Sequence, residues 1–488
     1  MLSVLMAALA GAFMPVEPDW PSILRNDATA FHDLIAANHP GPADPLNPGF
    51  SELNDAALRQ ALERSEKVKD YAGYVGAMRG YVARFDDSHL AYSVTDGPSV
   101  VLAWPGFLTT YTASGRYVVT TRLPDSPLET GDMLAECDGR SADALAASAL
   151  GAFTGRWMLE ATRSRTAWQL FTDDGNPFVQ RPETCVFERN GSDVTVSLTW
   201  RAFTDEAYEL YAAPLADPPT PALGSRVLAD GTRWFSFSSF DGAPDGYVAR
   251  RIEPMVAELE RDHAELAKAP RIVLDLRGNG GGSSLWSRRI AGAIWGDKAT
   301  AEAAPTSDGV DWRVSPANVE MFLGFRTKFA AAPAHIREYV EKMIAGLSEA
   351  HELGRPLWRE PKGLLAEDAE THIDSGDLAP LDTPVYVVTD TSCASACLDA
   401  VDLWRALGAV QVGRETDADT FYMDARRDAL PSGLGQAVVP MKVYRGRPRG
   451  SNAPWSPVRR FSGDIDDTSA LEDWIIGLAP PAASSGSR

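Results

Sequence analysis

Two continuous apolar segments, residues 271–276 and 384–389, place the strongest constraint on how this chain folds. Neither segment alternates apolar with polar residues, so each is expected to form a strand that is covered on both faces. Such strands belong to parallel sheets with helices on either side. Residues 247–266 form an amphipathic helical pattern, and another helical pattern starts just after Ser395. We therefore expect an α/β core over residues 222–478.

The N-terminal half of the chain follows two other patterns. Residues 17–95 have helical periodicity, and the Asn26–Asp27 pair is a candidate N-cap of the first helix. Over residues 100–205 the apolar period shifts towards two, with strand-like runs at 117–121 and 194–200. Because 488 residues are too many for one hydrophobic core, these shifts predict a helical N-terminal unit, a compact β module and the α/β core.

Three further segments interrupt or end this order. A Pro-rich stretch over residues 214–221 predicts a linker between the β module and the core. Residues 283–380 separate the two buried strands and predict an insertion, with a helix near residues 334–347. The Pro-, Ala- and Ser-rich residues 479–488 predict a disordered tail.

Charge and hydropathy limit the binding partners and the cellular compartment that we expect for this chain. The formal net charge is -21, and a surface this acidic repels phosphate backbones and anionic lipids, which argues against a nucleic-acid partner. No run reaches the roughly 20 apolar residues of a membrane-spanning helix. Residues 1–16 are apolar and contain a signal-peptidase-like site at Ala8–Gly11, although no Lys or Arg opens them; an apolar tail is the alternative. A signal would imply a periplasmic or extracellular protein, with the cytoplasm as the alternative.

The chain has four cysteines, in two pairs. Cys137 and Cys185 fall within the β module and are candidates for a disulfide if the chain is exported; two buried free thiols are the alternative. Cys393 and Cys397 have no second pair at zinc-site spacing, so small apolar packing is the expected role of both. A thiolate nucleophile here is a further alternative, ranked below Ser395.

The turn that carries Ser395 has the composition of a nucleophile turn. Residues 393–397 read Cys-Ala-Ser-Ala-Cys, between a buried strand and a helix. Small side chains let the strand turn sharply while an Oγ projects, and the helix N-terminus favours an oxyanion. Gly278–Gly282 end the other buried strand, where successive amides are able to point at one oxygen. Both turns leave the carboxyl ends of parallel strands, which predicts a serine hydrolase site; helix capping by Ser392 or Ser395 is the alternative.

Taken together, these segments resemble the tail-specific, or C-terminal-processing, peptidase family, to which the tricorn core also belongs. The resemblance rests on Leu274–Gly282, Ala394–Cys397 and Gln411–Thr416, in that order, and Ser126–Arg140 resemble part of the family's PDZ module. It implies a multidomain α/β protein in which a helical unit and a PDZ-like β module precede a ClpP/crotonase-like peptidase core with a helical insertion. It also implies a polypeptide substrate and neither a metal nor an organic cofactor.

The resemblance assigns roles to particular residues. Ser395 would be the nucleophile, and the amides of Gly280, Gly281 and Ala396 would form the oxyanion hole. One branch of the family uses a lysine some two dozen residues after the serine, but no lysine lies between Ser395 and Lys442.

The other branch of the family uses a histidine that follows a serine. Asp86–His89 matches this branch, so His89 would be the general base and Ser88 would position it; a surface or capping histidine is the alternative. The acid that completes the relay is not placed. Glu415 is the candidate, and Asp417, Asp419 and Asp424 also follow the nucleophile at plausible range.

These assignments imply a serine-type peptidase that forms an acyl-enzyme on Ser395. The missing lysine and the unplaced acid motivate the alternative of a catalytically inactive, peptide-binding homologue with the same fold. An esterase shares the Ser–His chemistry, but the chain lacks the Gly-x-Ser-x-Gly turn at this serine. The sequence does not indicate the oligomeric state.

Overall fold

The computed structural model describes residues 18–479 apart from residues 96, 206–207, 211–220, 244, 363 and 365–377. The predicted signal segment, almost all of the predicted Pro-rich linker and almost all of the predicted tail lie outside the described residues. Within the described part, no helix is both long and apolar enough to cross a membrane.

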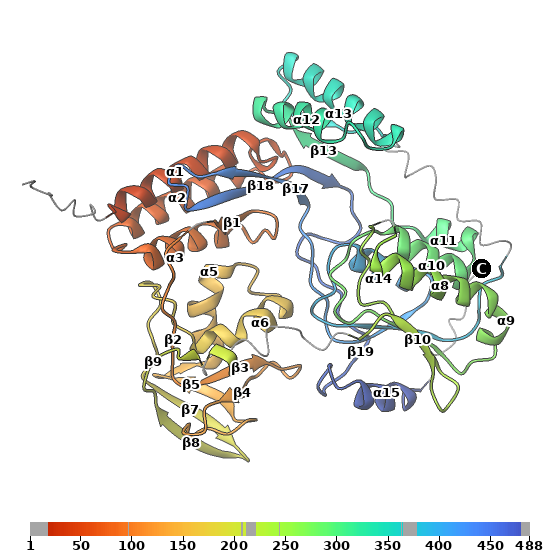
Figure 1. The fold of residues 1–488 in the computed structure, drawn as a ribbon, viewed down its shortest axis with the longest axis horizontal. Helices are drawn as coiled ribbons and strands as arrows, with labels where there is room; N and C mark the ends of the chain where they lie inside the picture. Colours follow the sequence, from red (N-terminus) through yellow and green to blue (C-terminus); the bar gives the residue numbers. More distant parts are fainter. Residues whose placement is uncertain are drawn as a thin grey trace, which may run out of the picture.

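A six-stranded, mostly parallel sheet forms the centre of the C-terminal part, as Figure 1 shows on the right. Its two predicted strands pair in parallel, with Ile272 opposite Val385, which confirms the sequence interpretation. The order of its strands is β10 (Gly224–Val227), β11 (Arg233–Ser236), β12 (Ile272–Asp275), β15 (Val385–Thr389), β16 (Val410–Gly413) and β19 (Arg459–Arg460).

Helices cover both faces of this sheet, as the continuous apolar strands required. Leu274 and Val387 point into a large core shared with α8 (Tyr247–Arg261), α10 (Leu285–Trp295) and α14 (Ala396–Ala406). On the opposite face, Val273 and Val388 pack with residues of α15 (Thr468–Ile476). Two short helices, α9 (His263–Leu266) and α11 (Asp297–Ala303), pack into the first of these two cores, on the same face as α8, α10 and α14.

A second sheet joins the two ends of the described chain. β1 (Ala91–Val94) pairs with β18 (Gly435–Arg445), Ala91 lying opposite Val438, and β18 also pairs with β17 (Tyr422–Ala429). Residues of α1 (Trp20–Asn38), α2 (Phe50–Ser65) and α3 (Tyr71–Val82) pack against Ala437 and Val439 on this sheet. The helical unit is therefore built on C-terminal strands.

The predicted insertion is divided between two parts of the molecule. Its first helices, α10 and α11, belong to the α/β core. Its later residues add β13 (Gly309–Arg313) and β14 (Leu357–Arg359) to the second sheet. They also form the helical hairpin of α12 (Pro316–Lys328) and α13 (Ala334–Glu352), at the top of Figure 1.

The first helix begins earlier than the sequence predicted. Its N-cap is Asp19, whose carboxylate accepts a hydrogen bond from the Ser22 amide at 3.1 Å. Asp27 lies inside the helix, fully buried, and accepts hydrogen bonds from the Tyr74 hydroxyl at 2.5 Å and the Ser432 amide at 3.0 Å. The predicted Asn26–Asp27 cap is therefore wrong, because this carboxylate serves tertiary contacts.

The β module occupies the lower left of Figure 1. Cys137 on β5 (Met133–Cys137) and Cys185 on β7 (Thr184–Arg189) lie opposite each other and form a disulfide, so the bridged alternative is the one observed. The sheet order is β3 (Phe107–Tyr111), β4 (Tyr117–Arg122), β5 (Met133–Cys137), β7 (Thr184–Arg189) and β8 (Ser192–Ser197), with β6 (Arg140–Ser141) beside β5. A small pair, β2 (Ala103–Trp104) and β9 (Arg201–Ala202), flanks it.

Short helices pack on this module and reach the core. They are α4 (Ala142–Ala146), the π-helix η3 (Ala147–Gly151), α5 (Ala152–Thr154), α6 (Glu160–Thr166) and the 3₁₀ helix η4 (Ala167–Phe171). Glu160 on α6 accepts a hydrogen bond at 2.7 Å from Arg414, the residue that follows β16. The module is thus joined to the core beside the candidate active site.

Candidate active site

Ser395 occupies the sharp bend between β15 and α14. Its φ of 54° and ψ of -124° place a non-glycine residue in the left-handed half of conformational space, where strained functional turns occur. Helix α14 begins at the next residue, Ala396, whose N–H has no acceptor within the helix because it lies in the first turn. The bend thus presents a hydroxyl next to a free amide at a helix N-terminus.

The glycine-rich turn after β12 lies directly against this bend. Gly281 has a φ of 101°, and a Cβ on it would lie 2.7 Å from both the Ala394 carbonyl oxygen and the Ser395 Cβ. Such a Cβ would also lie 3.0 Å from the Ala396 nitrogen. The structure therefore brings together the two turns that the sequence singled out.

The predicted oxyanion donors differ in their availability. The Gly281 N–H donates to the Asn279 side-chain oxygen at 2.9 Å, whereas the N–H groups of Gly280 and Ala396 donate to no acceptor in the described part of the chain. The Asn279 side chain also donates to the Phe237 carbonyl at 2.6 Å. Asn279 thus fixes the turn, and Gly280 and Ala396 are left with the free donors.

A buried carboxylate ties the two turns together. Asp390 accepts a hydrogen bond from the Gly278 amide and another from the Ser392 amide, both at 2.9 Å. Burial raises the pKa of Asp390 to about 6, despite these two donors. Sequence reasoning missed this residue, although its position directly after the buried strand was a signal of such a role.

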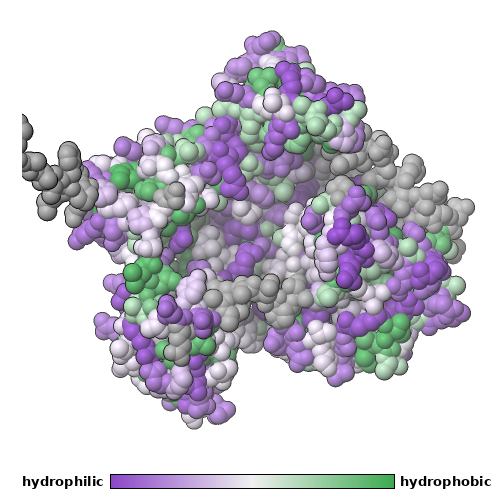
Figure 2. Space-filling view, viewed as in Figure 1, coloured by the Kyte–Doolittle hydropathy of each residue, from purple (hydrophilic) through white to green (hydrophobic). Residues whose placement is uncertain are grey.

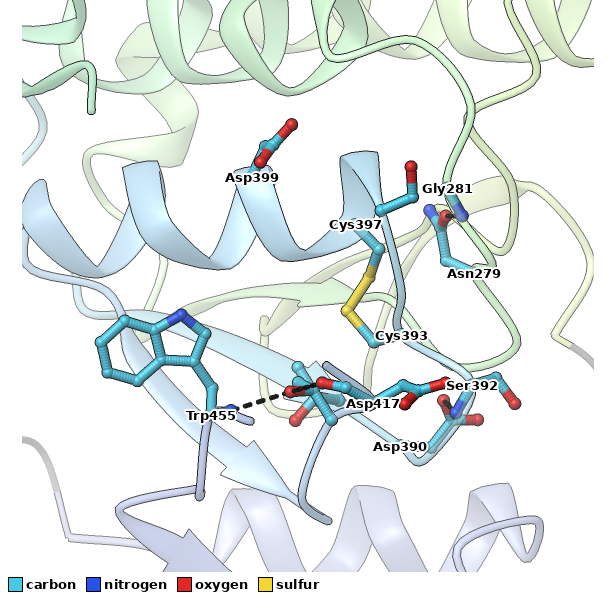
Figure 3. The surroundings of a disulfide bond; sticks show 12 residues. Asn279, Gly281, Asp390, Ser392, Cys393, Cys397, Asp399, Asp417 and Trp455 are labelled. Carbon is cyan, nitrogen blue, oxygen red and sulfur yellow. Dashed lines mark hydrogen bonds between the residues drawn. A yellow bond between two sulfur atoms is a disulfide. The ribbon is translucent and has the colours of Figure 1, made fainter. Parts of the chain in front are cut away.

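A disulfide spans the nucleophile turn. Cys393, which precedes Ser395 by two residues, is joined to Cys397 in the first turn of α14. Figure 3 shows the bond between the two sulfur atoms. The expectation of two unlinked, packed cysteines is therefore wrong. A disulfide sulfur is not a thiolate, so neither cysteine is a nucleophile in this oxidised form.

His89 reaches the same region from the other end of the chain. It follows the 3₁₀ helix η2 (Ala83–Phe85) and precedes β1, whose pairing with β18 brings it beside the segment before β17. Its Nδ1 lies 3.3 Å from the Thr420 Oγ1 and 3.2 Å from the Ser88 Oγ. The side chain is 29% exposed, so the ring is accessible from one side.

Residues 417–420 link the two halves of the candidate site. The Ser395 amide donates to the Asp419 carboxylate at 3.3 Å, and the next residue along, Thr420, contacts His89. Within the described residues, His89 and Ser395 form no direct hydrogen bond. The candidate base and the candidate nucleophile thus contact consecutive residues of one segment.

The other candidate acids have partners of their own. The Glu415 carboxylate accepts from Ser456 at 2.9 Å and does not contact His89. Asp424 pairs at 2.7 Å with Lys442, so this lysine is not placed at the nucleophile. Asp417 pairs with the guanidinium of Arg156 at 3.0 Å, from the β module.

A cavity of about 950 Å³ opens beside His89, between the helical unit and the short helices of the β module. Asp87, Ser88 and Arg156 are among the residues that line it. Figure 2 shows that the molecule is hollowed between its lobes and that the hollow has hydrophilic walls. The residues on either side of His89 in the sequence, Ser88 and Leu90, therefore line a space large enough for an extended peptide segment.

Comparison with solved structures shows the fold. Mature CPAF aligns over 93% of this chain and 96% of its own, with 14% sequence identity and a TM-score of 0.59. CPAF complexed with lactacystin aligns over 93% of this chain and 97% of its own, with 14% identity and a TM-score of 0.58. No family model and no curated protein matches the sequence.

These matches confirm a mixed α/β architecture with a helical N-terminal region and several sheets. The chain has the fold of CPAF over nearly its whole length. The tricorn protease also aligns over 94% of this chain, but its TM-score of 0.35 is too low to support an inference. At 14% identity, the likeness to CPAF establishes the fold only, so any activity has to be inferred from the residues of the candidate site.

Proposed function

We propose that this chain is a serine-type peptidase of the tail-specific, or C-terminal-processing, kind, with Ser395 as the nucleophile and His89 as the general base. One observation carries the proposal: His89 and Ser395, 306 positions apart in the sequence, are bound to the consecutive residues Thr420 and Asp419. The positive φ of Ser395 and the packing of Gly281 against it support the same conclusion.

The chemistry would be acyl transfer. The Oγ of Ser395 attacks a peptide carbonyl carbon while its proton passes to the Nε2 of His89. The N–H groups of Ala396 and Gly280 stabilise the oxyanion, with Gly281 shaping their turn. His89 returns the proton to the leaving amine, and water then hydrolyses the acyl-enzyme by the same route. Ser88 supports the ring through its contact with Nδ1.

The substrate would be a polypeptide held in extended form. In the β module, β3 at one edge of the sheet packs against η4, and the Thr109 hydroxyl donates to the Ala167 carbonyl at 2.8 Å. Strand β8 ends the sheet on the other side and is largely exposed. Strand addition at β8, or occupation of the cavity beside His89, would bring a peptide to the site.

A catalytically inactive peptide-binding protein is the second candidate. The lack of a direct hydrogen bond between His89 and Ser395 favours it. An active enzyme requires this contact to close when substrate binds, as catalytic hydrogen bonds often tighten only in the Michaelis complex.

The two disulfides bear on the compartment. Cytosolic thiol systems keep most cysteines reduced, whereas both observed bridges are stable in an oxidising environment. We propose a periplasmic or extracellular location.

Labelling with a fluorophosphonate probe tests the proposal. The wild type should be labelled, Ser395→Ala should not, and His89→Ala should be labelled about 10²- to 10⁴-fold more slowly. Ser392→Ala is the matched control, because it removes a neighbouring exposed hydroxyl and keeps the amide that Asp390 binds. An unlabelled wild type would favour the binding protein.

Substrate choice then separates a peptidase from an esterase. A peptidase hydrolyses a peptide amide as well as the matching peptide ester, whereas an esterase hydrolyses the ester alone. Loss of amide hydrolysis in Ser395→Ala assigns the activity to this site.

A further inference from the structure

A line of polar groups runs from the His89 ring through Thr420 to Asp87, one of the residues that line the cavity. The Thr420 hydroxyl lies 3.3 Å from the His89 Nδ1 and donates to the Asp87 Oδ1 at 2.9 Å. The same Asp87 oxygen accepts a hydrogen bond from the His89 amide at 2.8 Å. Asp87, which the sequence analysis left without a role, is thus connected to the ring through one hydroxyl.

The hydrogen bonds of Thr420 favour one direction for this line. The threonine hydroxyl has one proton, and its shortest acceptor is the Asp87 carboxylate; the Tyr422 carbonyl lies farther away, at 3.1 Å. Because Thr420 donates to Asp87, its oxygen is free to accept from a protonated Nδ1 of His89, and the Ser88 Oγ, 3.2 Å from the same nitrogen, is able to accept from it as well. A neutral ring with its proton on Nδ1 has an unprotonated Nε2, which is the form that a general base needs.

Asp87 is buried and incompletely bonded. Its side chain is 5% exposed, and its Oδ2 has no hydrogen-bond partner among the described residues. The Nε2 of His39 is also buried, has no hydrogen-bond partner in the same part of the chain and lies 3.9 Å from that oxygen, beyond hydrogen-bond length. A carboxylate with one uncommitted oxygen is well placed to interact with a positive charge that develops nearby.

His39 leaves the charge of Asp87 available. Its Nδ1 accepts a hydrogen bond from the Gly41 amide at 2.8 Å, so the proton of the neutral ring is on Nε2. Burial lowers the pKa of His39, which favours the neutral ring. Its stacking on Phe50, with ring centroids 4.4 Å apart, holds it in place.

The other charged groups around this line have counter-ions. Asp44 pairs with Arg445 at 2.7 Å, and Asp419 pairs with Arg447 at 3.4 Å. Asp87 has no Lys or Arg counter-ion in the described part of the chain.

We propose that Asp87, acting through the hydroxyl of Thr420, is the acidic partner of His89 in the catalytic relay. This inference rests on the proposed function and deepens it, since it assigns the acid that Glu415 does not supply. Asp87 and Thr420 are positioning residues and do not touch the substrate. When Ser395 gives its proton to the Nε2 of His89, the Nδ1 proton stays on the ring, and the Asp87 carboxylate stabilises the imidazolium.

Three variants separate charge from hydrogen bonding. Asp87→Asn keeps an oxygen for the Thr420 hydroxyl and the His89 amide and removes the charge. Thr420→Val removes the hydroxyl and keeps the shape, and Thr420→Ser restores the hydroxyl. Asp428→Asn is the control for loss of a carboxylate, because this residue pairs with Arg426 on β17 and is not part of the relay.

The first readout is the second-order rate constant of fluorophosphonate labelling, measured from pH 5 to pH 9. Asp87→Asn and Thr420→Val should label about 10- to 100-fold more slowly than the wild type, which corresponds to one hydrogen bond to a charged group. Thr420→Ser should label within about threefold of the wild type, a rescue that a merely structural role for this position does not predict. Asp428→Asn should label at the wild-type rate.

The pH profile distinguishes the charge of Asp87 from its packing. Without a carboxylate to stabilise the imidazolium, the acidic limb of the profile for Asp87→Asn should move to lower pH by about 1 unit. Thermal unfolding of each variant identifies any that fail to fold. If Asp87→Asn is unfolded, the comparison of Thr420→Val with Thr420→Ser still tests the relay.

The second readout does not depend on activity. Nitrogen-15 spectra of histidine-labelled wild-type protein, with the His89 signal assigned by its absence from His89→Gln, report the tautomer of this ring. We expect the Nδ1–H form at high pH, and the Nε2–H form would overturn the inference. Wild-type rates in both Asp87→Asn and Thr420→Val would overturn it as well. An unlabelled wild type would refute the proposed function. The tautomer of His89 would still show whether the hydrogen bonds from His89 through Thr420 to Asp87 run in the proposed direction.

Discussion

Replacing Gly281 by alanine is the sharpest test of the geometry around the nucleophile. The added methyl group would lie 2.7 Å from the Ala394 carbonyl oxygen and from the Ser395 Cβ. Carbon atoms in contact prefer about 3.5–4.0 Å, so one of the two turns must move by nearly 1 Å. Both neighbours belong to the nucleophile turn itself, so this movement would displace the hydroxyl or the oxyanion donors.

The expected effects of Gly281→Ala on folding stability and on labelling rate have separate causes. Alanine at a φ of 101° costs about 1–2 kcal/mol of folding stability, since its Cβ disfavours the left-handed region. A displacement of about 1 Å at the reacting groups costs roughly 10²-fold in rate. We therefore expect Gly281→Ala to react with a fluorophosphonate about 10²-fold more slowly while remaining folded.

Gly408→Ala is the matched control. Gly408 has a φ of 96°, and a Cβ on it would meet nothing within 4 Å. This variant should therefore lose a similar amount of stability to backbone strain and should label at the wild-type rate. Equal labelling rates for the two variants, with both folded by thermal unfolding, would refute the geometry proposed for the nucleophile turn.

Two further predictions concern the links that hold this turn. The double variant Cys393→Ala/Cys397→Ala should label roughly tenfold more slowly than the wild type, because the nucleophile turn loses its covalent tether. The control Cys137→Ala/Cys185→Ala should label at the wild-type rate but unfold at a lower temperature. The reverse pattern would contradict a role of the Cys393–Cys397 bridge in holding the turn. The pKa of Asp390 in the folded protein, about 6, lies above its ordinary value, so its contribution to stability is present at low pH and is lost as the pH rises. The unfolding free energy of the wild type, relative to Asp390→Asn, should therefore fall by roughly 2 kcal/mol from pH 4 to pH 7 in chemical denaturation, and a constant difference would count against this explanation.

Local patterns in the sequence were sufficient for the central sheet and its two turns. Strands 272–275 and 385–389 are almost entirely apolar because both their faces are covered. This requirement acts on consecutive residues, so it is visible in the sequence. The turns follow from small residues at the strand ends. These features depend on neighbouring positions, which is why periodicity and composition reveal them.

Features that depend on distant contacts were not predictable in the same way. Asp27 reads as a helix cap, yet the tertiary partners Tyr74 and Ser432 place it inside a helix. Cys393 and Cys397 read as small apolar residues, because spacing alone does not show that their side chains meet. Neighbouring residues in the sequence do not indicate which distant residues a side chain will contact.

The proposed acid of the relay shows the same limit most directly. Several carboxylates follow Ser395 at a plausible distance along the chain, and the candidate among them, Glu415, bonds to Ser456. The carboxylate that reaches His89 lies two positions before it, at Asp87, and the connection runs through Thr420, which contributes no charge. That hydroxyl comes within reach because β1 pairs with β18, a contact between strands more than 300 residues apart. A substitution that weakened this pairing should therefore slow labelling without altering any residue of the site, since the pairing of β1 with β18 is what places His89 beside the segment that binds Ser395.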